Sequence, residues 1–171
     1  MRRVALFVLL CLVVATPAMA GASDSTNTAP HQIKGVLEGT ATFVLLPTIP
    51  GPNGEAVDTL ADVSGIVQGL GRTNLFSFHR PCGPNLEYIE DGLVRIVAAD
   101  GDVIRGHYVG NTAPGAEPNQ QISTVDYVIT GGTGRFANAS GTIHVTVYIT
   151  VLGLDVFEWP VTFVLEGTVS Y

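Results

Sequence analysis

The stretch from Val125 to Val151 reads VDYVITGGTGRFANASGTIHVTVYITV, and it decides the fold class. Between residues 142 and 151, every even position holds Thr, His or Tyr, while every odd position holds Ile or Val. A period of two is typical of a strand with one apolar face. A shorter alternating run precedes the glycine-rich segment, residues 131–141. The pattern therefore predicts two long strands joined at a sharp corner.

Similar runs recur along the chain, separated by clusters of turn residues. We expect strands at residues 32–46, 62–70, 74–80, 93–98, 102–110, 123–130, 142–152 and 156–170. Eight antiparallel strands favour closure into a barrel, because closure removes the exposed edges of the sheet. The sequence thus predicts an all-β protein with a closed eight-stranded antiparallel β-barrel. The interior of such a barrel holds side chains or one small ligand.

The first twenty residues have the composition of an export signal. Arg2 and Arg3 precede an apolar stretch, and Ala18-Met-Ala20 forms a small-residue cleavage site. An uncleaved anchor is the alternative, but the apolar stretch is shorter than the roughly 20 residues that a membrane span needs. We therefore expect a signal peptide at 1–20, a flexible leader at 21–31 and a single β-barrel domain at 32–171. The mature protein is then secreted or periplasmic and has no membrane span.

Charge and cysteine content narrow the possible partners. Removal of Arg2 and Arg3 lowers the basic residues from eight to six against 15 acidic ones, so the formal charge becomes −9. Nucleic-acid binding is not expected, because it depends on cations that neutralise phosphates. Cys82 is the only cysteine after the signal, so no internal disulfide forms. The neighbouring prolines and glycine predict a tight loop around Cys82 rather than a nucleophile.

The cluster from Gly131 to Gly134 is similar to a dinucleotide-binding turn, but its context excludes that function. Such a turn opens a helix within a βαβ unit, whereas a strand follows here. The glycines instead predict a corner in which at least one residue has a positive φ.

A family resemblance covers this same segment. The run from Val125 to Thr142 resembles the signature of the allene oxide cyclase and dirigent barrel superfamily: an aromatic strand, Thr-Gly-Gly-(Ser/Thr)-Gly-x-Phe, a short turn and a glycine that opens the next strand. Residues 35–43 and 165–171 resemble small exported bacterial members. The resemblance implies an eight-stranded barrel of the calycin type, often a trimer, with an apolar cavity open at one end. It also implies fatty-acid epoxide cyclisation, phenoxy-radical coupling or polyketide ring closure, without metal or organic cofactor. The matching residues form the structural corner, so no catalytic residue is carried over.

Five polar residues are candidates for a site. His79 ends a predicted strand beside a Pro-rich loop, where a barrel mouth is expected. His107, His144, Glu158 and Glu166 lie on the polar faces of their strands. Imidazole and a desolvated carboxylate suit proton transfer near neutral pH. If the polar faces point inward, these residues form an acid–base site. If the apolar faces point inward, as is usual in soluble antiparallel sheets, only the rim around His79 remains.

Three functions are compatible with this sequence. The first is an exported barrel that binds a small hydrophobic molecule in its cavity. The second is a cofactor-free isomerase or cyclase acting on an apolar substrate, and the third is a filled barrel with a structural role. The first two need an empty pocket, whereas the third does not. We expect no cofactor and no metal, because the histidines lack ligand spacing. The expected partners are a small hydrophobic ligand and further copies of the chain, as a trimer.

Overall fold

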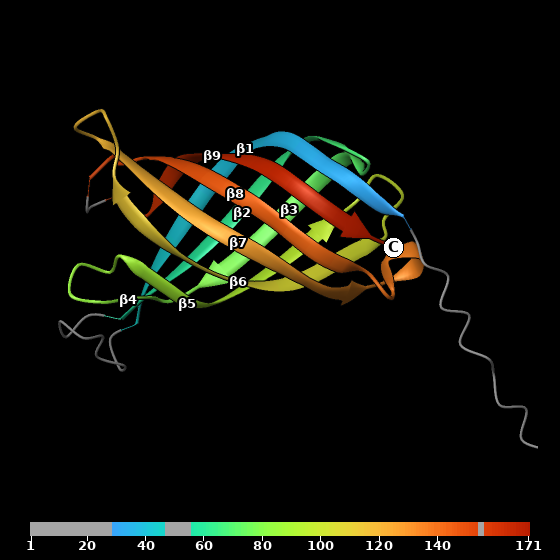
Figure 1. The fold of residues 1–171 in the computed structure, drawn as a ribbon. Helices are drawn as coiled ribbons and strands as arrows, with labels where there is room; N and C mark the ends of the chain where they lie inside the picture. The colour runs from blue at the N-terminus through green and yellow to red at the C-terminus, as the bar shows by residue number, and fades with distance from the viewer. Residues whose placement is uncertain (1–28, 47–55, 154–155) are drawn as a thin grey trace, which may run out of the picture.

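A computed structural model describes residues 29–46, 56–153 and 156–171. The expected signal peptide and most of the expected leader lie outside these ranges. The described elements are β1 (Pro30–Leu46), β2 (Ala56–Gln68), β3 (Gly71–His79), β4 (Pro81–Cys82), β5 (Tyr88–Val97), β6 (Val103–Pro114), β7 (Gln120–Gly132), the 3-10 turn η1 (Gly134–Phe136), β8 (Ser140–Thr150) and β9 (Glu158–Ser170). Figure 1 shows an elongated barrel whose strands run obliquely to its long axis.

The sheet closes on itself. Its order is β3-β2-β1-β9-β8-β7-β6-β5-β4, and a further pairing of β3 with β5 joins the two sides. Every pairing between neighbours is antiparallel. Eight long strands form the wall, while the two-residue β4 only extends the edge of β5. The prediction of a closed eight-stranded antiparallel barrel is therefore confirmed.

Two strands begin five or six residues earlier than the sequence pattern predicted. β2 begins at Ala56 rather than at residue 62, because the stretch before Asp62 already pairs with β1. β5 begins at Tyr88 rather than at residue 93. A register irregularity between Ile89 and Gly92 breaks the alternation there, and this β-bulge hides the first half of the strand from a period-two search.

The glycine corner takes the predicted form. Gly131 and Gly134 have φ values of 136° and 52°, a region that side chains with a Cβ rarely adopt. Gly132 has another reason to lack a side chain, because a Cβ there would meet the carbonyl oxygen of Val103. The single turn η1 follows and buries Phe136 completely. The corner thus positions one aromatic ring at this end of the barrel.

That ring belongs to an aromatic plug. Phe136 packs edge-on against Tyr171 with ring centroids 4.6 Å apart, and the Arg135 guanidinium lies over both rings. Tyr171 also stacks on His31 and donates a hydrogen bond to the Gly69 carbonyl. Large aliphatic side chains fill the adjacent interior: Ile33, Leu37, Val67, Leu75, Ile96, Ile104, Ile143 and Leu165 are all less than 2% exposed. This half of the barrel is closed and packed.

Candidate functional site

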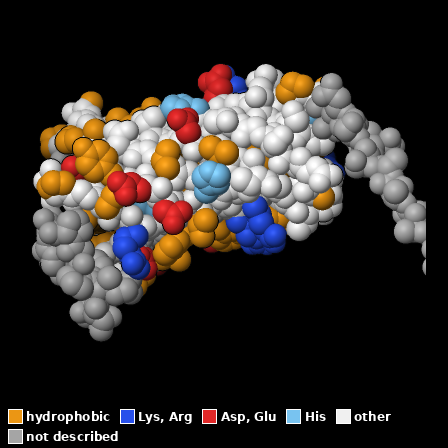
Figure 2. Space-filling model, turned by 60° about the horizontal axis from the view of Figure 1, so that its bottom comes forward, with side chains coloured by type: hydrophobic (Ala, Val, Ile, Leu, Met, Phe, Trp, Pro, Cys, Tyr) orange, Lys and Arg blue, Asp and Glu red, His pale blue; other side chains and the backbone are white. Residues whose placement is uncertain are grey.

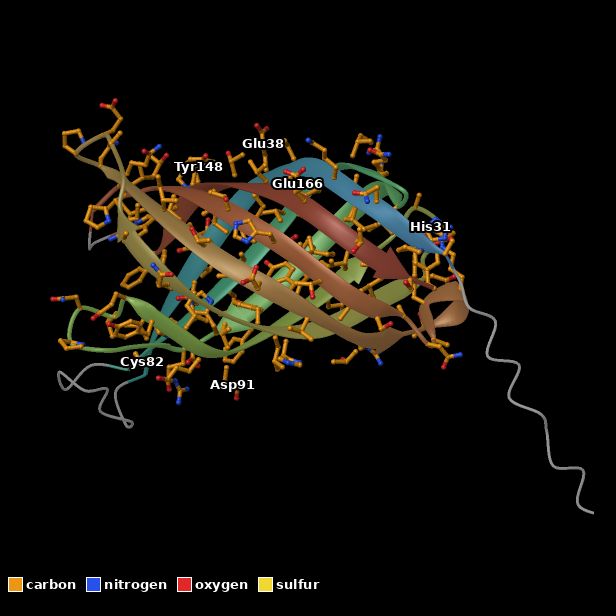
Figure 3. All side chains as sticks on the ribbon, in the orientation of Figure 1. His31, Glu38, Cys82, Asp91, Tyr148 and Glu166 are labelled. Atoms are coloured by element: carbon orange, nitrogen blue, oxygen red, sulfur yellow. The ribbon has the colours of Figure 1, made fainter. Side chains whose placement is uncertain are left out.

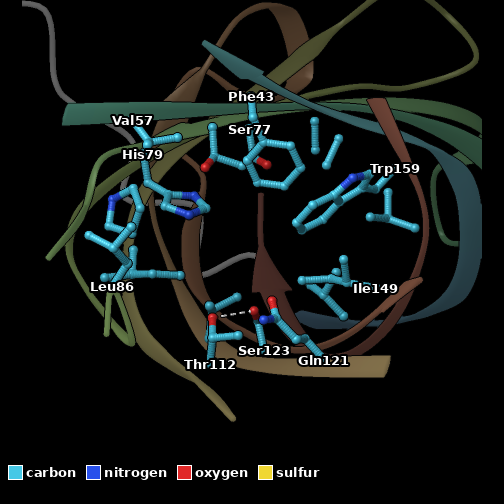
Figure 4. Close-up of a pocket in the computed structure, with 18 of the residues that line it drawn as sticks. Phe43, Val57, Ser77, His79, Leu86, Thr112, Gln121, Ser123, Ile149 and Trp159 are labelled. Atoms are coloured by element: carbon cyan, nitrogen blue, oxygen red, sulfur yellow. Dashed lines mark hydrogen bonds between the residues drawn. The ribbon is translucent and has the colours of Figure 1, made fainter. Parts of the chain in front are cut away.

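The opposite half of the barrel is hollow. A cavity of about 720 Å³ opens between the ends of β1, β3, β6 and β9, beside the turn that follows β4. Figure 4 shows its lining, with Phe43 and Trp159 on one wall and His79 on another. A volume of this size accommodates a drug-sized molecule.

A row of small residues explains why this half is empty. Ala41 pairs directly with Ala61, and Ala61 pairs with Ser77, so three small side chains lie side by side across β1, β2 and β3. All three are buried and line the cavity. The equivalent inward positions in the packed half hold Leu, Ile and Val, which fill the space. The hollow therefore follows from side-chain volume along the strands.

Aromatic residues extend the wall beside that row of small side chains, because Trp159 on β9 is the cross-strand partner of Ala41 and Phe43 lies two residues further along β1. Trp159 lies beside Phe43, with ring centroids 4.3 Å apart and planes inclined by 51°. The indole N–H of Trp159 donates to the Gly153 carbonyl over 3.2 Å, so its polar atom is satisfied outside the cavity. Trp159 is also the single tryptophan of the chain. The wall therefore offers a ligand an apolar surface.

A polar pair interrupts the apolar lining. The Nδ1 atom of His79 is hydrogen-bonded to the hydroxyl of Tyr108 at 2.9 Å, and the two rings meet edge to face. A neutral imidazole uses only one nitrogen in this contact. Its Nε2 has no hydrogen-bond partner in the described part of the chain and remains for a ligand. The Tyr127 ring lies beside the Tyr108 ring at 5.0 Å, and both hydroxyls interact with Ser77.

Burial keeps this group uncharged. It lowers the pKa of His79 to about 4, although the nearby Asp58 carboxylate opposes the change. Burial likewise raises the pKa of Tyr108 and of Tyr127 well above the ordinary tyrosine value, while hydrogen bonding with Ser77 opposes it. At neutral pH the cluster is therefore a set of neutral donors and acceptors.

Gly92 leaves room for the Tyr108 ring because it has no side chain. Gly92 is the cross-strand partner of Tyr108, directly after the bulge in β5. A Cβ on Gly92 would overlap atoms of the Tyr108 ring, so the ring lies flat against the backbone of β5. Gly92 and the bulge thus bring the hydroxyl of Tyr108 to His79.

A second neutral pair lies elsewhere in the cavity. The hydroxyls of Thr112 and Ser123 are 2.6 Å apart, from paired positions on β6 and β7. Gln121 lies one inward position further along β7, at the cavity rim. Figure 4 shows this pair across the hollow from Ser77 and His79. The cavity thus presents two separate polar spots.

Four of the five predicted site residues lie elsewhere. His107, His144, Glu158 and Glu166 are all exposed, and none of them lines the cavity. His144 contacts the Asp126 carboxylate at 2.9 Å on the outer surface, and Figure 3 shows Glu166 pointing away from the barrel. Of the two alternatives that the sequence left open, the structure therefore has the one in which the polar faces of these strands point outward. The apolar faces point inward, because burying apolar side chains is favourable, whereas burying charged groups without partners costs free energy.

Charged residues lie on the outer surface, and Cys82 directly follows Pro81 of the cavity lining. Figure 2 shows acidic, basic and histidine side chains interspersed with apolar ones on one outer face. Cys82, in β4, lies against the Tyr88 carbonyl with its Sγ 3.6 Å away. Its thiol pKa is raised, by desolvation first and then by the Glu90 and Glu87 carboxylates. A raised pKa lowers the thiolate fraction and argues against a nucleophile.

Most of the polar group in the cavity was not predicted from the sequence. Tyr108, Tyr127 and Ser77 lie at inward positions of their strands, among Val, Ile and Phe. A usable signal exists: a tyrosine on the apolar face of an alternating run carries a hydroxyl into the interior, where it needs a partner. The strand-end position of His79 was identified, and the structure places it in the cavity wall.

Two other kinds of feature are absent from the described residues. No helix in the described ranges is long and apolar enough to cross a membrane. Within the same ranges, His, Cys, Asp and Glu side chains form no group of three or more that is placed to hold a metal ion. Comparison of the chain with protein-family models, curated proteins and solved structures gives no match.

Proposed function

We propose that this protein binds a small hydrophobic molecule inside its barrel. The observation that carries the proposal is the open cavity of about 720 Å³ in an otherwise packed barrel. Phe43, Trp159 and Phe163 supply aromatic surface, and the small residues Ala41 and Ala61 leave room for the ligand. Apolar pockets with a few fixed polar groups are typical ligand sites.

The cavity argues against a filled structural barrel. The packing of Ile33, Leu37 and Leu165 shows that this scaffold can be filled in one half. Small residues in the other half forgo that stabilisation, since each buried aliphatic side chain contributes about 1.5–3 kcal/mol. A ligand bound in the cavity occupies the space that these small side chains leave, and this accounts for the missing packing.

The electrostatics favour binding over proton transfer. A general acid or base works best with a pKa near the operating pH. The pKa of His79 is about 4, and burial moves the pKa of Tyr108 in the opposite direction. Neither group exchanges protons readily at pH 7, but both form hydrogen bonds. The pair therefore suits recognition of a ligand rather than the isomerase or cyclase chemistry that the family resemblance implies.

Export, family membership and self-association belong to the same proposal. The signal-like first twenty residues support a secreted or periplasmic protein, and the barrel is compatible with an allene oxide cyclase or dirigent-like member. Self-association is supported by an apolar row on the outer wall, and the family resemblance implies that the assembly is a trimer. Leu60, Phe78 and Leu93 are direct cross-strand neighbours, with exposed fractions of 42%, 37% and 56%. Contiguous exposed apolar side chains commonly mark contact surfaces.

The binding proposal is tested with N-phenyl-1-naphthylamine, an uncharged fluorescent probe that accepts energy from tryptophan. Selective excitation of Trp159 should give probe emission that saturates on titration. The variant Ala41→Phe fills the hollow and should weaken binding by about tenfold or more. The matched control is Thr40→Phe, which adds the same ring at the adjacent, exposed position of β1 and should bind like the parent. Equal binding by both variants, or no binding by the parent, contradicts the proposal.

A further inference from the structure

The charges around the cavity are arranged unevenly. The polar groups that line its interior are hydroxyls, amides and the neutral imidazole of His79. Among the described residues of the lining, the charged side chain is Glu87, in the segment between β4 and β5 at the mouth. Glu87 accepts a hydrogen bond from the Asn85 backbone N–H at 2.8 Å, which fixes its carboxylate at the rim.

The nearest cation of the chain at this end is already paired. Arg80 follows His79 directly and donates two hydrogen bonds to Asp58, at 2.7 Å and 3.1 Å. This bidentate contact satisfies the guanidinium on the outside of the barrel. The other basic residues of the described chain are exposed and lie outside the cavity: Lys34, Arg72, Arg95, Arg105 and Arg135.

An anion that enters this cavity therefore loses its hydration without gaining a counter-charge. Burying a lone charge in an apolar site is far more costly than burying a hydrogen-bonded neutral group. Neutral hydroxyl and carbonyl groups, in contrast, find partners at His79 and Tyr108 on one side and at Thr112 and Ser123 on the other. The rim carboxylate of Glu87 adds repulsion for anions at the point of entry.

We infer that the cavity selects uncharged hydrophobic molecules that carry hydroxyl or carbonyl groups, and that it rejects anions of the same shape. This inference rests on the proposed binding function and specifies the class of ligand. It separates neutral phenols, alcohols and ketones from fatty acids and aryl carboxylates. The determinants are the neutral lining, Glu87 at the mouth and the Asp58 contact that holds Arg80 outside.

A matched pair of probes tests the inference. N-phenyl-1-naphthylamine is neutral, and 8-anilinonaphthalene-1-sulfonate is the same skeleton with a sulfonate that stays ionised across the working pH range. Energy transfer from Trp159 measures the binding of both probes. Probe emission that persists in Ala41→Phe is subtracted, because it comes from probe bound outside the cavity. We expect the sulfonate to bind in the cavity about tenfold more weakly or worse.

A gain-of-function variant makes the test independent of loss of folding. Gln121→Arg adds a cation at the rim and should raise the ratio of sulfonate affinity to neutral-probe affinity by about tenfold. Thr124→Arg adds the same charge on the outer face of β7 and should change neither affinity. Equal affinity of the parent for both probes overturns the inference and leaves the binding function standing. Binding of neither probe overturns both.

Discussion

Partly buried His79 should make folding sensitive to pH in a defined window. The imidazole has a pKa of about 4 in the folded protein, against 6.5 in the unfolded chain. Between these values the unfolded state binds the proton and the folded state does not. The free energy of unfolding therefore falls as pH decreases through this window, and the contribution is fully present above pH 6.5.

The size of the effect follows from the same two values. Linkage gives a loss of about 2 kcal/mol at pH 5 and about 3 kcal/mol at pH 4, relative to neutral pH. In His79→Asn the amide occupies the place of Nδ1 and keeps a partner for Tyr108, but it does not titrate. The variant should lack this loss while sharing the titration of every other group with the parent.

The assay is urea unfolding followed by Trp159 fluorescence at several pH values between 4 and 7. At neutral pH the parent should have the higher free energy of unfolding. Its advantage over His79→Asn should shrink, or become a disadvantage, as pH falls. An NMR titration of the His79 ring protons checks the pKa directly in the folded protein. Parallel stability curves for the two proteins, or a His79 that titrates near 6.5, would refute the reasoning.

Three further predictions concern other parts of the barrel. Gly132→Val and Gly134→Val should each lower the free energy of unfolding by roughly a few kcal/mol. A side chain at position 132 would meet a backbone carbonyl, and position 134 has a positive φ. Unchanged melting temperatures for both variants would show the corner argument to be wrong. Tyr108→Phe removes the hydroxyl bonded to His79 and should cost about 1–3 kcal/mol in urea unfolding. Light scattering should give a trimer mass, reduced to a monomer mass in Phe78→Glu; a monomeric parent at high micromolar concentration contradicts self-association.

The barrel was predictable because its signal is local. Alternation over residues 142–151 and the glycines at 131–134 each depend on a few consecutive residues, and both were confirmed. The start of β5 was not predictable, because a bulge shifts the period before Gly92. Local pattern thus identifies regular strands and loses the irregular ones.

The site was less predictable because it depends on register. Ala41, Ala61 and Ser77 are far apart in the sequence, and only strand pairing shows that they form one row of small side chains. The same holds for the approach of Tyr108 to His79. Glu158 and Glu166 were proposed as acids because alternation does not say which face is inside. Residue volume on the apolar face carries the missing information, but only after the register is known.

Methyl NMR spectroscopy tests the central claim, that an apolar ligand enters the hollow half of the barrel. On addition of N-phenyl-1-naphthylamine, the methyl signals of Val125, Val147 and Ile149, which line the cavity, should shift and saturate together. The signals of the exposed Val36 and Val164 on the outer wall should stay in place. Shifts confined to the outer methyl groups, with the cavity methyl groups unchanged, would contradict the account.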